Sequence, residues 1–75
     1  MTEALELLPD ARRYVAEGER CLAKQEAIVD ALERKGQDTI EALDRLEVLK
    51  EMQAEYIEHL EKLERKVLVL VRPEE

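Results

Sequence analysis

A regular stripe in the second half of the chain constrains the fold more than any other feature. Its members, all apolar except one glutamine, alternate spacings of four and three residues over four heptads. They are Ala42, Leu46, Leu49, Gln53, Tyr56, Leu60, Leu63, Val67 and Leu70. This spacing places every member on one face of an α-helix that packs along its length against another helix. The sequence therefore predicts a long helix over about residues 39–71.

The first half of the chain carries a stripe that could face this helix. Apolar pairs recur at intervals of seven residues: Tyr14 with Val15, Cys21 with Leu22, and Ile28 with Val29. Pro9 suits the first turn of a helix, because the N–H group that proline lacks has no intrahelical partner there. We therefore expect a helix over about residues 9–35, a lead-in segment over residues 1–8 and a tail over residues 72–75.

The break between the two stripes is short and carries stop and start signals for helices. Gly36 suits the left-handed position that follows a helix end. Asp38 suits the N-cap of the next helix, with Glu41 three residues later as its capping-box partner. We therefore predict a loop over residues 36–38. A connection this short makes the two helices antiparallel neighbours.

These signals predict an all-α chain, an antiparallel two-helix hairpin that resembles a coiled coil, as a single domain over residues 9–71. We expect the seam between the helices to contain Leu22, Ile28, Val29, Leu32, Leu46, Leu49, Tyr56, Leu60 and Leu63. Folding the chain about the middle of its loop places Gly18 opposite Tyr56, where a glycine leaves room for the ring. The same fold places Gln53 near Leu22.

Two helices alone bury little apolar surface, which argues for a second copy. The chain has 75 residues, and 41% of them are charged, against about 25% in a typical soluble domain. Small scaffolds without disulfides or metals usually need additional support. Ile40, Leu43, Met52 and Ile57 flank the main stripe and widen the apolar face beyond a two-helix seam. We therefore expect a homodimer that closes as a four-helix bundle.

The segment Val67–Val71 is apolar on every side of a helix and is rich in valine, which favours strands. Three alternatives stay open. The segment completes the second helix and packs on the N-terminal leucines, it forms a subunit contact, or it pairs as a strand or frays. Together with two flanking residues it supplies the candidate interface: Met52, Ile57, Val67, Leu68, Val69, Leu70 and Val71.

Two glutamines and the only cysteine lie on the apolar stripes. Gln25 and Gln53 either fix the register and the oligomeric state or sit at the seam edge and reach water, and the sequence favours neither. A single cysteine forms no intramolecular disulfide and no multi-cysteine metal site. The position of Cys21 on the stripe predicts a small buried residue rather than a reactive thiol.

Charge and composition argue against several function classes. The formal net charge is −7, and the lysines and arginines are mixed among acids, which argues against nucleic acid and anionic membranes as partners. The chain contains no serine, so it cannot build a Ser-His-Asp set. His59 has Tyr56 three residues before it, where a di-iron bundle needs a glutamate. We expect no catalytic, cofactor-binding or metal-binding residues and no cofactor.

Several short segments resemble those of a family of small bacterial proteins. They are Ala16-Glu17-Gly18-Glu19-Arg20, Gln25, Leu32-Glu33-Arg34 and Gly36-Gln37-Asp38-Thr39. They look like segments of short, uncharacterised helical-hairpin proteins found largely in alphaproteobacteria, over roughly residues 12–63. The resemblance implies a bacterial cytoplasmic protein of unknown function and transfers no catalytic residues. Residues 67–71 lie outside it.

These features favour a non-enzymatic structural or protein–protein interaction module that self-associates. The alternative is an adaptor or regulator that binds an amphipathic helix of a partner protein. An enzyme or metal carrier belongs to a third class, and stoichiometric metal lost on His59→Ala would be needed to support it. Because the sequence shows no signal peptide and no apolar run of the roughly 20 residues that span a membrane, we expect a cytoplasmic location.

Overall fold

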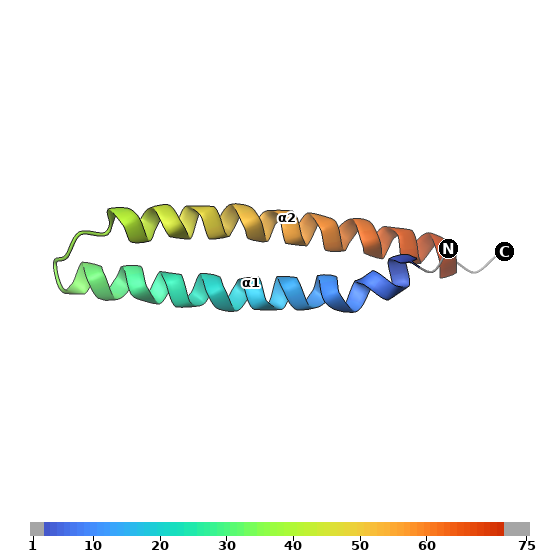
Figure 1. The fold of residues 1–75 in the computed structure, drawn as a ribbon, viewed down its shortest axis with the longest axis horizontal. Coiled ribbons are helices and arrows are strands. Elements are labelled where there is room, and N and C mark those ends of the chain that lie inside the picture. Colours follow the sequence, from blue (N-terminus) through green and yellow to red (C-terminus); the bar gives the residue numbers. More distant parts are fainter. Residues whose placement is uncertain (1–2, 72–75) are drawn as a thin grey trace.

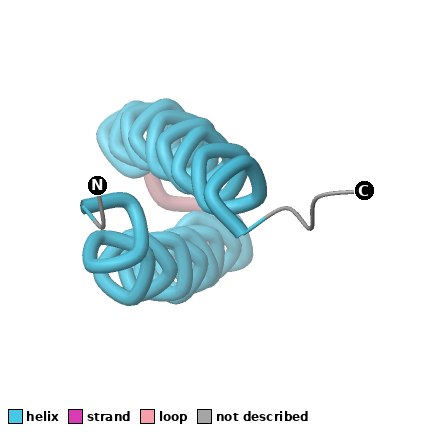
Figure 2. Tube along the Cα trace, turned by 90° about the vertical axis from the view of Figure 1, so that its right-hand side faces the viewer, coloured by secondary structure: helices cyan, strands magenta, loops and turns pink. Residues whose placement is uncertain are grey.

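Two long antiparallel helices make up the structure. The computed structural model describes residues 3–71, with α1 over Glu3–Arg34 and α2 over Ile40–Val71. The helices lie side by side, joined at one end by a short loop, and the Cα trace measures 62 × 20 × 14 Å (Figure 1). The end view shows the two helices as one stacked pair (Figure 2). The predicted all-α antiparallel hairpin is confirmed, and the predicted tail over residues 72–75 lies outside the described residues.

The first helix begins six residues before its predicted start. The expected lead-in is helical from Glu3 onward, and Pro9 lies inside α1 rather than in its first turn. Proline removes one backbone hydrogen bond there and crowds the carbonyl four residues earlier, and the blue end of α1 leans toward α2 in Figure 1. The helix persists because Ala4 and Leu8 are buried in a cluster shared with α2. The lead-in prediction was therefore wrong for the part of that segment that the structure describes.

The loop end of α1 closes in a Schellman motif that depends on Gly36. The N–H of Gly36 donates to the carbonyl oxygen of Glu33 at 3.0 Å, and the N–H of Gln37 donates to that of Leu32 at 2.9 Å. These bonds satisfy carbonyls that the helix end would otherwise leave unpaired. Gly36 has a φ of +69°, a conformation that costs other residues roughly 1–2 kcal/mol.

Asp38 caps the start of α2. Its Oδ1 accepts a hydrogen bond from the N–H of Ile40 at 3.0 Å, and the carbonyl oxygen of Thr39 accepts the N–H of Leu43 at 2.8 Å. The reciprocal capping-box bond expected from Glu41 is not among the hydrogen bonds of the described residues. One side chain therefore supplies the cap, and the connection between the helices extends over residues 35–39.

The two helices are offset by about one turn from the predicted register. Tyr14, rather than Gly18, lies level with Tyr56, and the two rings stack with centroids 5.7 Å apart. Gln53 likewise bonds to the carbonyl oxygen of Val15, whereas the predicted register placed it near Leu22. The prediction treated loop residues as helical, but an extended residue advances about 3.3 Å against 1.5 Å in a helix. The loop therefore runs back along α1, and the last turn of α1 extends beyond the first turn of α2 (Figure 1).

The seam is regular on both helices but thin. On α1 it alternates spacings of four and three residues through Ala4, Leu8, Ala11, Val15, Gly18, Leu22, Gln25, Val29 and Leu32. Its buried residues form two groups. At the open end, away from the loop, these are Ala4, Leu8, Ala11 and Leu63, and toward the loop they are Gln25, Val29, Leu46 and Gln53. No side chain among the described residues is fully buried.

Candidate interaction surface

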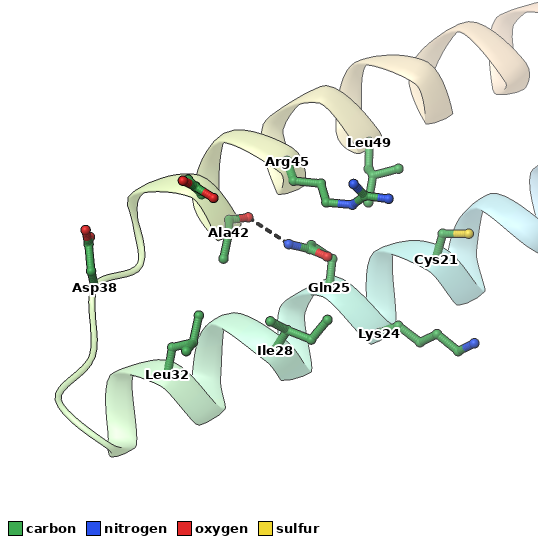
Figure 3. A pocket seen from close by; sticks show the side chains of 10 residues that line it. Cys21, Lys24, Gln25, Ile28, Leu32, Asp38, Ala42, Arg45 and Leu49 are labelled. Atoms are coloured by element: carbon green, nitrogen blue, oxygen red, sulfur yellow. Dashed lines mark hydrogen bonds between the residues drawn. The ribbon is translucent and has the colours of Figure 1, made fainter.

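Two buried glutamines bridge the helices in the loop half of the seam. Nε2 of Gln25 donates to the carbonyl oxygen of Ala42 at 2.9 Å (Figure 3), and Nε2 of Gln53 donates to that of Val15 at 2.9 Å. The two residues are only 6% and 5% exposed. The alternative in which they reach water at the seam edge is therefore wrong. Each glutamine ties its own helix to the backbone of the other, which fits a role in setting the register.

Gly18 makes room for Gln53 rather than for Tyr56. A Cβ atom on Gly18 would overlap Oε1 of Gln53. This oxygen is buried and has no hydrogen-bond partner among residues 3–71, while Nε2 of the same amide donates to the carbonyl oxygen of Val15. The amide therefore lies directly against the backbone of α1, at a place where only glycine admits it.

One broad face of the hairpin carries a groove between the helices. Three cavities lie along it, one near the loop, one in the middle and one at the open end. Cys21 and Leu49 line both of the first two cavities. In the loop-end cavity, Ile28 and Cys21 come from α1, and Arg45 and Leu49 come from α2 (Figure 3). We call this side of the molecule the groove face.

The α1 wall of the groove is a second heptad stripe beside the seam. It consists of Leu7, Tyr14, Cys21 and Ile28, each of which lines a cavity and is exposed. The predictions of a seam position for Ile28 and of burial for Cys21 are wrong. Val29 and Leu22 occupy the seam, and the preceding residues point about 100° away around the helix. The apolar pairs in the sequence could have indicated this second stripe. A two-helix seam needs only one residue of each pair, so the other residue lies beside the seam.

The other predicted seam residues lie between the helices to different depths. Val29, Leu46 and Leu63 are buried, whereas Leu22, Leu32, Leu49, Tyr56 and Leu60 are half-buried. The half-buried group includes three residues that also line the groove: Leu32, Leu49 and Tyr56. At these three residues the apolar seam therefore continues into the groove.

The predicted interface residues divide between the two flanks of α2. Met52 lines the middle cavity, whereas Ile57 lines none of the three. The two residues lie about 140° apart around the helix, on opposite sides of the seam. They are almost equally exposed, at 41% and 40%. Leu68 is also exposed, and the side chain of Val71 lies outside what the structure describes.

The segment Val67–Val71 continues α2 as a helix, so the strand and frayed-tail alternatives are wrong for it. Val67 packs against the buried open-end cluster. Val69 and Leu70 line the open-end cavity together with Leu7. Val67 therefore packs within the hairpin, as the first remaining alternative requires. Val69 and Leu70 lie on another face of the segment, which is open to contact with another molecule, as the second requires.

The opposite face of the hairpin carries mostly charged side chains. Its exposed positions beside the seam are Leu5, Arg12, Glu19, Glu26 and Glu33 on α1, and Leu43, Lys50, Ile57 and Glu64 on α2. Leu5 is the one apolar residue of this set on α1, whereas Leu43 and Ile57 alternate with charged residues on α2. The matching positions on the groove side are Leu7, Tyr14, Cys21 and Ile28 on α1, and Arg45, Met52, His59 and Lys66 on α2. The two faces therefore differ chiefly on α1, whose groove side is an uninterrupted apolar stripe.

Charged side chains elsewhere form no site. Asp30 pairs with Arg34 at 2.6 Å and Glu58 with Lys62 at 3.8 Å, and all four are exposed, so solvent screens both pairs. Within residues 3–71 no group of three or more histidine, cysteine, aspartate or glutamate side chains is placed to hold a metal ion. Over the same residues, neither helix has an apolar stretch long enough to cross a membrane.

No protein-family model, curated protein or solved structure matches the chain. Function is therefore inferred from the surface that the hairpin presents.

Proposed function

We propose that this chain is a non-enzymatic protein–protein interaction module that self-associates. In this proposal two hairpins form a homodimer and close as a four-helix bundle. The observation that carries it is the uncovered apolar surface. Twelve large hydrophobic side chains of the described residues are exposed, and the groove gathers several of them on one face. Apolar surface gathered in this way is typical of interaction sites, because leaving it in water is unfavourable.

The thin seam supports the same proposal. Each helix has 32 residues but buries only one narrow stripe against the other. Each stripe also includes one buried glutamine, Gln25 on α1 and Gln53 on α2. A small scaffold without disulfides buries a low fraction of its surface and gains stability from oligomerisation. A second copy supplies that burial without any change in the hairpin itself.

The shape of the groove favours a second candidate, an adaptor that binds an amphipathic helix of a partner protein. A groove between two long helices is a surface into which a third helix can lay its apolar face. For this candidate the isolated chain stays a monomer, and the partner completes a three-helix bundle.

Absolute molar mass distinguishes the two candidates. Light scattering on a gel-filtration column, over a hundredfold range of protein concentration, gives the mass of the species in solution. A constant mass near twice 8.7 kDa is expected for the homodimer. A monomer throughout the range would overturn self-association and leave the adaptor as the better candidate.

A further inference from the structure

We infer that the second copy of the proposed homodimer covers the groove face with its loop at the opposite end from the loop of the first. The inference rests on the proposed self-association and adds the contact face and the orientation to it. The two-fold axis lies between the two hairpins and crosses their long axes at right angles. Each helix then lies antiparallel to its own counterpart, α1 on α1 and α2 on α2.

The residues beside the seam select the groove face. Five of its eight positions there are apolar: Leu7, Tyr14, Cys21, Ile28 and Met52. The other three lie on α2 and are basic: Arg45, His59 and Lys66. On the opposite face three of nine such positions are apolar: Leu5, Leu43 and Ile57. Covering the groove face therefore removes more apolar side chains from water and desolvates fewer charges.

The apolar stripe of α1 matches itself when two copies run antiparallel. One register covers all four members, with Leu7 against Ile28 of the second copy and Tyr14 against Cys21 of the second copy. The bulky ring of Tyr14 thus meets a small side chain. A slide by one heptad leaves one member of each stripe uncovered. The axis therefore passes level with residues 17–18 of α1.

The hairpin itself then fixes which parts of the two α2 helices meet. The lining of the middle cavity runs from Tyr14 to Cys21 on α1 and from Leu49 to Tyr56 on α2. The middle of α1 at residues 17–18 therefore lies level with residues 52–53 of α2. The axis crosses α2 at that level, so the contact between the α2 helices needs no second choice of register.

The α2 wall, which carries the basic residues of the groove, is largely matched in this register. Met52 meets Met52 of the second copy at the axis, and Lys66 meets Asp38 of the second copy. Arg45 meets His59, with Glu55 of the second copy one turn away from this contact. The wall therefore combines an apolar contact, an opposite-charge contact and one contact between two basic side chains.

The outer flanks of the groove, one turn before the stripe and the wall, bring opposite charges together in the same register. On α1, Asp10 meets Lys24 of the second copy, and on α2, Glu41 meets Lys62 of the second copy. The two-fold axis repeats each contact. The like-charge contact on these flanks is Glu17 with its own counterpart, at an exposed edge where salt screens it.

Two of these residues already form ion pairs within the chain. Asp10 pairs with Arg13 at 3.3 Å, and Lys62 pairs with Glu58 at 3.8 Å. All four side chains are exposed, and such pairs contribute little in water, so they leave Asp10 and Lys62 able to bind a second partner. A register set by the apolar stripe alone therefore brings opposite charges together on both helices, which favours a second copy as the occupant of the groove.

The opposite orientation, with both loops at one end, mismatches the groove. There α1 of one copy lies on α2 of the other, so the apolar stripe faces the wall of α2: Arg45, Met52, His59 and Lys66. A slide by a heptad keeps the same two rows in contact. Asp10 finds an opposite charge in this orientation too, at Lys62, so the apolar rows decide. Only the antiparallel arrangement places the stripe against apolar side chains along its whole length.

A charge exchange on α1 tests the orientation. Asp10 and Lys24 are fourteen residues apart, about 21 Å along one helix, so they cannot meet within one chain. We expect Asp10→Lys and Lys24→Asp each to weaken the dimer by at least about threefold at low salt, because each creates two like-charge contacts. The double variant should recover the native affinity. Light scattering over a range of concentrations measures the dissociation constants. Single variants without effect, or a double variant weaker than either single one, would overturn the orientation.

A spin-label distance between the two loops tests the orientation independently. The label is placed at Gln37, an exposed loop residue, in a Gln37→Cys variant that also carries Cys21→Ala. Each loop lies about 25 Å or more from the axis, because about seventeen helical residues separate them. We therefore expect a pulsed electron–electron distance of about 50 Å or more. A distance below about 35 Å would place the loops together and overturn the orientation while leaving self-association intact.

The mass of the labelled protein separates this failure from failure of the proposed function. Light scattering on the same sample gives that mass before the distance measurement. A monomeric mass and no intermolecular distance would overturn the proposed self-association on which the inference rests.

A matched pair of variants tests the face. Met52→Glu places a charge at the axis in the groove, and Ile57→Glu places the same charge at an equally exposed position on the opposite flank. We expect Met52→Glu to weaken the dimer by at least about tenfold, because two carboxylates then meet in the interface, and Ile57→Glu to leave its affinity unchanged. Circular dichroism verifies that both variants keep their helicity. Any other pattern among helical variants overturns the assignment of the groove face.

Discussion

The two halves of the seam hold the helices together by different means. The open end is aliphatic: Ala4, Leu8 and Ala11 of α1 surround Leu63 of α2. The loop half instead places Gln25 and Gln53 between the helices, each bonded to a backbone carbonyl of the other helix. Apolar burial has no preferred direction, so the open end stabilises the hairpin without specifying one register. A hydrogen bond requires a particular distance and angle, so the glutamines specify which residues face each other.

The buried amide of Gln53 requires a small residue opposite it, and that residue is Gly18. A buried amide needs space between the helices, and Gly18 provides it opposite Gln53. The open end meets the same requirement differently, with two alanines of α1 against a leucine of α2. Small residues of α1 therefore face large residues of α2 in both halves, but only the loop half places a polar group in the gap.

The largest expected effect comes from breaking the open end. Leu63→Ala removes the side chain at the centre of the aliphatic cluster, and the loss of buried area plus the cavity should cost about 2–5 kcal/mol. Chemical denaturation at a fixed protein concentration measures this loss. Leu68→Ala is the matched control, because Leu68 lies on the same part of α2 but is exposed. Equal losses for the two variants would show that the open-end cluster does not stabilise the hairpin.

A smaller effect is expected at Gly18, and its sign depends on Gln53. In an exposed helix interior, glycine to alanine stabilises by about 1 kcal/mol. In the native chain the new methyl group displaces the Gln53 amide from its bond to Val15, so we expect Gly18→Ala to give no gain. In a Gln53→Ala background the overlap is gone, and the same change should stabilise by about 1 kcal/mol. A double-mutant cycle from denaturation curves measures the coupling, and additive effects would contradict this account.

Replacing the glutamines by leucine is expected to change the register more than the stability. Oε1 of Gln53 is buried without a partner, so a leucine of similar size removes an unfavourable group together with the hydrogen bond. We expect Gln25→Leu and Gln53→Leu each to change the free energy of unfolding by less than about 1.5 kcal/mol. The double variant should lose its single register and show multiple or broadened amide signals in NMR spectra. One sharp set of signals, like that of the native chain, would contradict a register role for the glutamines.

Much of the hairpin could be predicted because its signals are local. The four–three alternation on α2 and the glycine and aspartate of the loop each act within a few residues, so they predicted both helices and their antiparallel order. The prediction failed at Pro9, where local preference argued for a helix start. Burial of Ala4 and Leu8 against α2 outweighed that preference, and no local pattern contained this contact.

The candidate surface was predictable only in part. The flanking apolar residues of α2 indicated a surface wider than one seam, but they did not show which flank faces a groove. Ile28 was assigned to the seam and Cys21 to a buried position because they share apolar pairs with Val29 and Leu22. A pair on a helix spans about 100°, and only the packing of the second helix decided which member points inward.

The sequence by itself determined that this chain forms two long amphipathic helices joined by a tight, capped loop. Periodicity, capping and loop length act between residues close in the chain, and they are sufficient for that result. The tertiary structure decided the register and the exposed stripe. Both depend on how far the extended loop runs back along α1 and on the amide of Gln53 fitting against Gly18. These are contacts between residues far apart in the chain, and hydrophobic periodicity is nearly unchanged by a shift of one helical turn.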